Sequence, residues 1–150
     1  MRLRLAKSGR LNLVSVDVTH DLSVMSSIAR FVGCNTALQV GLDGSVNIER
    51  IGKRVITSIG GHADFCVAAS RSIGGFSVIA LRSTTPRGDS AIVAAVDTVS
   101  TPRCDVSVVV TEHGIADLRG VGDSQRAQRI AAIAAPQHRK ALMAQMDTLV

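Results

Sequence analysis

Two short stretches of this 150-residue chain combine glycines with ionisable side chains in patterns that could support chemistry. The first, residues 58–65, reads Ser-Ile-Gly-Gly-His-Ala-Asp-Phe and predicts a strand that ends at Gly60 and Gly61, with a helix starting at Asp64. Backbone N–H groups at such a junction can hold an oxyanion or a phosphate, and glycine lets a ligand approach the backbone closely. The same residues would equally serve as a tight strand-to-helix turn.

The second stretch, residues 111–120, reads Thr-Glu-His-Gly-Ile-Ala-Asp-Leu-Arg-Gly and follows a predicted buried strand, where α/β proteins place ligand sites. It contains Glu112, one of only two glutamates in the chain. A carboxylate at the end of a strand could be a nucleophile, a base or a partner that orients an arginine. The alternative is a structural salt bridge, for example between Asp117 and Arg119.

Other familiar catalytic and cofactor motifs are missing from the sequence. There is no G-x-S-x-G, no Walker A loop and no H-E-x-x-H, and Gly120 and Gly122 lack the third glycine of a dinucleotide fingerprint. The histidines have no metal-ligand spacing, so we predict surface or packing roles for them and no metal site. They are His20, His62, His113 and His138.

The hydrophobic pattern predicts the elements that would position these stretches. Asp43 and Gly44 are the turn of a predicted hairpin, and residues 91–96 and 106–110 are nearly continuous apolar runs, typical of parallel strands buried on both faces. Strands are predicted at residues 38–42, 46–48, 55–59, 76–81, 91–96 and 106–110, and helices at 21–30 (capped by Asp21 or Ser23), 64–74, from Asp123 or Ser124, and 136–146. The chain therefore predicts an α/β domain with an open, largely parallel sheet flanked by helices.

Composition limits the classes of partner. Apolar residues make up 46% of the chain and charged residues 19%, which is typical of a globular protein. The only aromatics are three phenylalanines, so we expect no nucleic-acid partner, because base stacking needs an aromatic platform. The net charge of +5 would attract an anionic ligand such as a nucleotide or a coenzyme phosphate, although solvated basic faces and a basic tail give the same total.

The cysteines and the absence of long apolar runs suggest a compartment. Three dispersed cysteines without a C-x-x-C pair fit free thiols in a reducing cytoplasm. No stretch approaches the roughly 18 apolar residues that span a bilayer, and the residues before Asp17 lack the apolar core of a secretory signal. We therefore expect a cytoplasmic protein with no membrane partner; the acid-free, arginine-containing start leaves a transit peptide as the alternative.

Taken together, several motifs resemble one family. They are Asn35-Thr-Ala-Leu-Gln39-Val, Gly44-x-Val-Asn, Gly60-Gly61-x-x-Asp-Phe, Ser83-Thr with Arg87-Gly88, Thr101-Pro-Arg-x-Asp-Val, Val110-Thr-Glu-x-Gly-x-Ala-Asp-Leu-Arg-Gly and Ile130-Ala-x-Ile-Ala-x-Pro-x-x-Arg. These are similar to the C-terminal domain of the acetyl-CoA hydrolase/transferase family, which includes 4-hydroxybutyrate and succinyl-CoA:acetate CoA-transferases. The resemblance predicts that residues 21–150 form this domain, of the CoA-transferase fold type, and that residues 1–20 form a basic N-terminal tail or arm.

The resemblance also implies roles for individual residues. Gly61 matches a backbone donor to the oxyanion, and Glu112 matches a glutamate that orients the catalytic machinery. Coenzyme A or acyl-CoA, as substrate, would be bound by Gly60, Gly61, Arg87, Gly88, Asn35 and Gln39. Arg87 stands where a lysine that contacts coenzyme A is usual, and Gln39 replaces a usual glutamate.

The expected function follows from what the family's C-terminal domain supplies. In the family a glutamate of the N-terminal domain attacks the thioester, and no position of this chain matches it. We therefore expect the C-terminal half of an acyl-CoA:carboxylate CoA-transferase or acetyl-CoA hydrolase, which would need a separately encoded N-terminal half and would form a homo-oligomer. The alternative is a non-catalytic remnant or a module that only binds coenzyme A.

Overall fold

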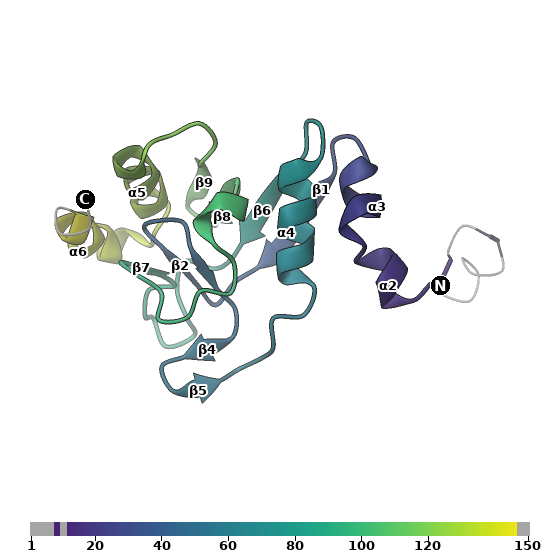
Figure 1. Ribbon diagram of the computed structural model, residues 1–150. Helices are drawn as coiled ribbons and strands as arrows, with labels where there is room; N and C mark the ends of the chain where they lie inside the picture. The colour runs from purple at the N-terminus through teal and green to yellow at the C-terminus, as the bar shows by residue number, and fades with distance from the viewer. Residues whose placement is uncertain (1–7, 10–11, 147–150) are drawn as a thin grey trace.

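The computed structural model describes residues 8–9 and 12–146, and its main feature is a four-stranded sheet. The strands are β1 (Val32–Thr36), β6 (Phe76–Ala80), β8 (Val108–Thr111) and β9 (Gly114–Asp117), in the order β1-β6-β8-β9. β1, β6 and β8 run parallel, and β9 returns antiparallel beside β8 (Figure 1). The predicted α/β class with a largely parallel sheet is confirmed.

Helix α4 (His62–Arg71) packs on β1 and β6 (Figure 1). The approach is close because Gly33 of β1 has no side chain: a Cβ there would lie 2.7 Å from the Phe65 carbonyl oxygen. A short helix, α3 (Leu22–Ser27), packs on α4 in turn. Its N-cap is Asp21, whose carboxylate accepts hydrogen bonds from the backbone N–H groups of Ser23 and Val24, as the sequence predicts.

A second, smaller sheet has the order β3-β2-β7. β2 (Gln39–Gly41) and β3 (Val46–Asn47) form the hairpin predicted around Asp43 and Gly44, and β7 (Ile92–Val93) runs parallel to β2. Val40, Val46 and Ile92 of these strands are fully buried. A separate hairpin, β4 (Arg50–Ile51) with β5 (Arg54–Val55), is exposed.

Two helices complete the C-terminal part. α5 (Asp123–Ala132) packs on β9, and α6 (Pro136–Met146) packs on α5 (Figure 1). A 3-10 turn, η1 (Arg103–Asp105), precedes β8 and contacts α4. Within the described residues, no helix is long and apolar enough to cross a membrane, and no group of His, Cys, Asp and Glu residues could hold a metal ion.

Some sequence expectations are wrong at the level of single elements. Of the strand predicted at 55–59 only Val55 pairs, because residues 56–59 have no neighbouring strand and remain exposed. The run 91–96 contributes only Ile92 and Val93. Residues 16–19, within the predicted N-terminal tail or arm (residues 1–20), form a helical turn, α2 (Val16–Thr19). Residues 1–7, 10 and 11 of this tail lie outside the described residues.

Candidate functional site

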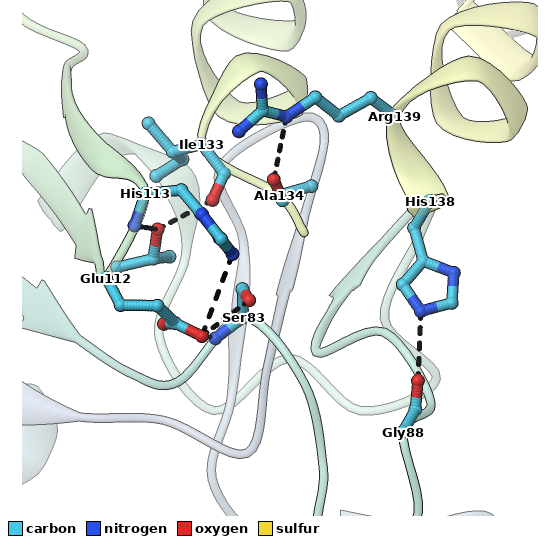
Figure 2. A network of polar contacts seen from close by, with 9 residues as sticks. Ser83, Gly88, Glu112, His113, Ile133, Ala134, His138 and Arg139 are labelled. Atoms are coloured by element: carbon cyan, nitrogen blue, oxygen red, sulfur yellow. Dashed lines mark hydrogen bonds and ion pairs between the residues drawn. The ribbon is translucent and has the colours of Figure 1, made fainter. Parts of the chain in front are cut away.

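Glu112 lies in the turn between β8 and β9 and binds Ser83, at the end of the neighbouring strand β6 (Figure 2). Its Oε2 accepts a hydrogen bond from the Ser83 backbone N–H at 2.9 Å, and its Oε1 accepts one from the Ser83 hydroxyl at 2.8 Å. The Ser83 N–H lowers the pKa of Glu112 to about 2, helped by the Ser83 hydroxyl and, more weakly, by His113. Glu112 is therefore ionised at neutral pH, with both oxygens occupied.

Ser83 opens a loop, residues 83–90, whose far end is also held from outside. His138 of α6 donates a hydrogen bond from Nε2 to the Gly88 carbonyl oxygen at 2.9 Å (Figure 2). Inside the loop, the N–H of Thr85 donates to the Asp89 carbonyl, and the N–H of Gly88 donates to the Thr85 carbonyl. Gly88 has φ +88°, a conformation that favours glycine. The loop is thus fixed by the β8–β9 turn at one end and by α6 at the other.

This loop forms one wall of a cavity of about 650 Å³. Arg87 of the loop, Arg82 just before it and Arg54 of the β4–β5 hairpin line the cavity, against one carboxylate, that of Asp89. The remaining lining is mostly apolar and is contributed by residues 36–38, Ile51, Ile56, Pro86 and Ala91, with Thr84 and Thr85. An excess of guanidinium groups over an apolar wall suits an anionic ligand that also has an uncharged portion.

A second cavity of about 320 Å³ adjoins the first, because residues 36–38 line both. Asn35 and His62 line it, and the Asn35 amide donates to the Cys66 thiol sulphur at 3.4 Å. Burial raises the pKa of Cys66 to about 11, so this sulphur stays a thiol at neutral pH. The arginines line the first cavity and His62, at the start of α4, lines the second, with residues 36–38 between them.

His62 is a packing histidine at the start of α4. It is 7% exposed; its Nε2 donates to the Thr36 carbonyl at 3.1 Å, so its Nδ1 accepts from the Thr101 hydroxyl at 2.8 Å. Burial lowers its pKa below the usual 6.5. The ring therefore joins β1, α4 and residue 101 as a neutral group.

The lowered pKa of His62 predicts a loss of stability in mild acid. The unfolded chain binds a proton at this histidine more readily than the folded chain, so stability is full above pH 6.5 and falls as pH drops below it. Urea unfolding should show a smaller free energy at about pH 5.5 than at about pH 7.5. His62→Gln should reduce this difference, and an unchanged difference in that variant would contradict the assignment.

Gly60 and Gly61 precede α4, and Gly61 is its N-cap. Gly60 has φ +54° and open space around it. Gly61 is covered: a Cβ there would collide with the His20 ring, which also packs edge-on against Phe65 with centroids 5.1 Å apart. The N-terminal segment thus covers the glycine that the sequence points to as an oxyanion donor.

Gln39 has a structural partner rather than a place in the cavities. Its Oε1 accepts from the Asn47 amide at 2.9 Å, and the same amide donates to the Arg50 carbonyl. Asp117 and Arg119 form the salt bridge considered as an alternative role for their stretch, with Nη2 and Oδ2 2.7 Å apart. Glu112 is a separate feature, since its carboxylate holds Ser83.

The structure therefore groups the predicted site residues unequally. Glu112 and Gly88 hold the loop that carries Arg87, Asn35 lines the adjoining cavity, Gly60 and Gly61 lie beside its His62, and Gln39 is turned to the small sheet. Sequence reasoning missed Arg82, Arg54 and His138. Arg54 belongs to a short basic group with Arg50 and Lys53, and this group was the sequence feature that could have pointed to Arg54 as a site residue.

Comparisons with known proteins identify the family of this chain. A family model described as the acetyl-CoA hydrolase/transferase C-terminal domain matches residues 4–146. The 4-hydroxybutyrate coenzyme A transferase of Clostridium kluyveri is 39% identical over 133 residues, which are 86% of this chain and 31% of that protein. The acetyl-CoA hydrolase of Candida albicans is 36% identical over 100 residues, 66% of this chain and 19% of that protein.

Solved structures give the same result. RipA from Yersinia pestis superposes with a TM-score of 0.78 and 34% identity, covering 89% of this chain and 30% of RipA. A 4-hydroxybutyrate CoA-transferase from Porphyromonas gingivalis superposes with a TM-score of 0.76 and 32% identity, covering 95% of this chain and 34% of the transferase. The chain thus spans between 19% and 34% of the length of these relatives.

Proposed function

Because the chain belongs to the acetyl-CoA hydrolase/transferase family through its C-terminal domain, we propose that it is the coenzyme A-binding part of an acyl-CoA:carboxylate CoA-transferase or acetyl-CoA hydrolase. The glutamate nucleophile would come from the N-terminal portion, meaning the part of a family member that precedes the matched domain. We further propose that the protein acts in the cytoplasm as a homo-oligomer. The observation that carries the proposal is the arginine-lined cavity beside a loop held at both ends.

The cavity offers what a coenzyme A thioester requires. The phosphates of coenzyme A need cations, which Arg54, Arg82 and Arg87 supply. The uncharged pantetheine arm of coenzyme A needs an apolar channel. The adjoining cavity shares residues 36–38 with the first and is lined by His62, the residue after Gly61. We assign the phosphates to the arginines and the thioester to the glycine turn.

Glu112 acts in this proposal as a positioning residue. Each oxygen of Glu112 accepts a hydrogen bond from Ser83, which stabilises the negative charge and makes this carboxylate a poorer nucleophile than an unbound one. Its pKa of about 2 also makes it a weak nucleophile and keeps it from donating a proton at neutral pH. Glu112 instead fixes the start of the loop that places Arg87 in the cavity.

Gly61 would supply a backbone N–H to the developing oxyanion, as helix N-termini do. In the structure the His20 ring lies against Gly61, in the space that a Cβ would occupy. This cover is the observation that favours the second candidate, a module that binds coenzyme A without catalysis. The two functions share the arginine-lined cavity and differ at Gly61.

The proposal predicts salt-sensitive binding of coenzyme A through Arg87. Arg87→Gln should weaken binding about tenfold, roughly 1.4 kcal/mol, because one guanidinium contact to a phosphate is lost. Added salt should weaken the wild type more than this variant. Isothermal titration calorimetry with coenzyme A measures both effects.

Arg71→Gln is the matched control for this measurement. Arg71 lies in the last turn of α4, is exposed and is outside both cavities, so its loss changes the net charge equally without touching the site. We expect the Arg71 variant to bind like the wild type. Equal weakening by both variants would reduce the effect to net charge and remove the cavity from the proposal.

A further inference from the structure

The four-stranded sheet has two faces, and the pairing register assigns each residue to one of them. Val32, Cys34 and Thr36 of β1 pair with alternate residues of β6, so their side chains share a face. The register continues this face across β8 and β9. We call it the outer face; it comprises Val32, Cys34, Thr36, Phe76, Val78, Ala80, Val108, Val110, Ile115 and Asp117.

The opposite face is buried, whereas most of the outer face is not; Val108, at 7% exposed, is the buried residue of the outer face. On the inner face, Ile79, Val109 and Ala116 are at most 1% exposed, and α4 packs there against Gly33. On the outer face, Ile115 is 70% exposed and Val32 is 47% exposed. The side chains of Cys34 and Thr36 are exposed as well, and Phe76, Val78, Ala80 and Val110 are only half-buried.

An uncovered parallel sheet is unusual for a physical reason. Parallel strands occur almost only in sheets with both faces covered, and their sequences are apolar on both sides. β6 and β8 have such sequences, Phe-Ser-Val-Ile-Ala and Val-Val-Val-Thr. In the described part of the chain the outer face lacks the second layer that these residues call for, and exposed apolar patches of this kind mark interaction sites.

We propose that the outer face is the docking surface for helices of the N-terminal portion of a CoA-transferase chain. The alignment with the relative from Clostridium kluyveri covers 31% of that protein, so 69% of its length lies outside the aligned region. The family model that matches this chain describes a C-terminal domain. Helices are the layer that covers parallel sheets, whereas a second copy of this face would place sheet on sheet. The inference rests on the proposed function.

The outer face is continuous with the candidate site. Thr36, the last outer-face residue of β1, also lines both cavities. A helix docked along β1 would therefore reach the rim of both cavities. Docking at this surface would place the N-terminal portion where its nucleophile can reach the bound thioester.

The three cysteines give a direct test of the surface. Cys34 lies on the outer face and is exposed, Cys104 lies in η1 and is also exposed, and Cys66 is buried. The full chain is co-expressed with the N-terminal portion of the Clostridium kluyveri transferase, and the purified complex is treated with a maleimide. We expect Cys34 to lose its reactivity in the complex while Cys104 keeps it, with each site assigned by mass spectrometry.

Substitution gives an independent readout of the same surface. Ile115→Asp should weaken association about tenfold or more, because it replaces the most exposed apolar side chain of the outer face with a charge. Val99→Asp is the matched control, since Val99 is 56% exposed and lies outside the outer face. Circular dichroism confirms the fold of each variant, and the Cys34 labelling needs no variant at all.

The outcomes separate this inference from the proposed function. Failure of the two chains to co-purify, or unchanged reactivity of Cys34 in an active complex, overturns the docking surface but leaves the function standing. Protection of Cys34 without transferase activity supports the surface and counts against the function. Sedimentation could also show a dimer of this chain that Ile115→Asp dissociates. If the N-terminal portion does not displace the second copy from that dimer, the outer face belongs to the second copy and the proposal is overturned.

Discussion

The isolated chain is expected to bind coenzyme A and to show no transfer between acetyl-CoA and a carboxylate. Both of its glutamates already have hydrogen-bond donors: Glu49 accepts from the Ser100 hydroxyl at 2.7 Å, and Glu112 holds Ser83. Without a covalent nucleophile, the rate should fall by a factor on the order of a million relative to a complete transferase. The measurement is acetate-dependent formation of product, followed with the pure chain and then with the N-terminal portion added.

The control for this prediction is Glu112→Gln in both preparations. In the pure chain it should change nothing, because there is no turnover to lose. In the complex it should lower activity by loosening the loop at Ser83, and much of the loss should appear as a raised KM for acyl-CoA. Robust transfer by the pure chain that Glu112→Gln abolishes would make Glu112 the nucleophile and defeat the prediction.

Gly61→Val is expected to abolish coenzyme A binding, and Gly88→Ala should weaken it far less. A side chain at Gly61 would occupy the space that a thioester needs beside the N–H and would also collide with His20. Gly88 has open space around it, so alanine there costs only the strain of its positive φ, about 1 kcal/mol. Calorimetry on folded variants compares the two.

A variant of His20 distinguishes loss of the binding site from loss of the fold when Gly61 is substituted. His20→Ala removes the cover, so it should strengthen binding by itself and relieve the collision in His20→Ala/Gly61→Val. That double variant should fold like His20→Ala and still fail to bind coenzyme A. Wild-type affinity in Gly61→Val, or in the double variant, would remove the glycine turn from the binding site.

The sequence predicts well wherever one local signal decides the structure. Asp43-Gly44 makes a hairpin turn, and Pro136 opens α6. Helix α4 ends at Arg71 with Ser72 as its C-cap, before the paired glycines at 74 and 75. The alternation at residues 55–59 misleads, because a strand needs a neighbour and that segment has none. β1 and β9 were missed because glycines at 33 and 114 interrupt their apolar pattern, and only the fold shows that α4 needs the space at Gly33.

The candidate site divides in the same way. Arg87 and Gly88 belong to one recognisable motif and Glu112 to another, so these residues could be singled out from the sequence. Arg54 and His138 come from a hairpin and a helix that are distant in sequence, and only tertiary packing brings them to the loop. The cover of Gly61 by His20 could not be predicted either, because it joins a weakly patterned N-terminal segment to α4.

The double attachment of residues 83–90 has a consequence for how this loop opens. Its first amide hydrogen is bonded to the Glu112 carboxylate, and its Gly88 carbonyl is bonded to His138 of α6. The loop therefore cannot expose its amides to deuterium freely as a surface loop would, since opening it also breaks contacts of the β8–β9 turn and of α6. Ligand bound at Arg87 would slow hydrogen exchange in α6, about 50 residues further along the chain.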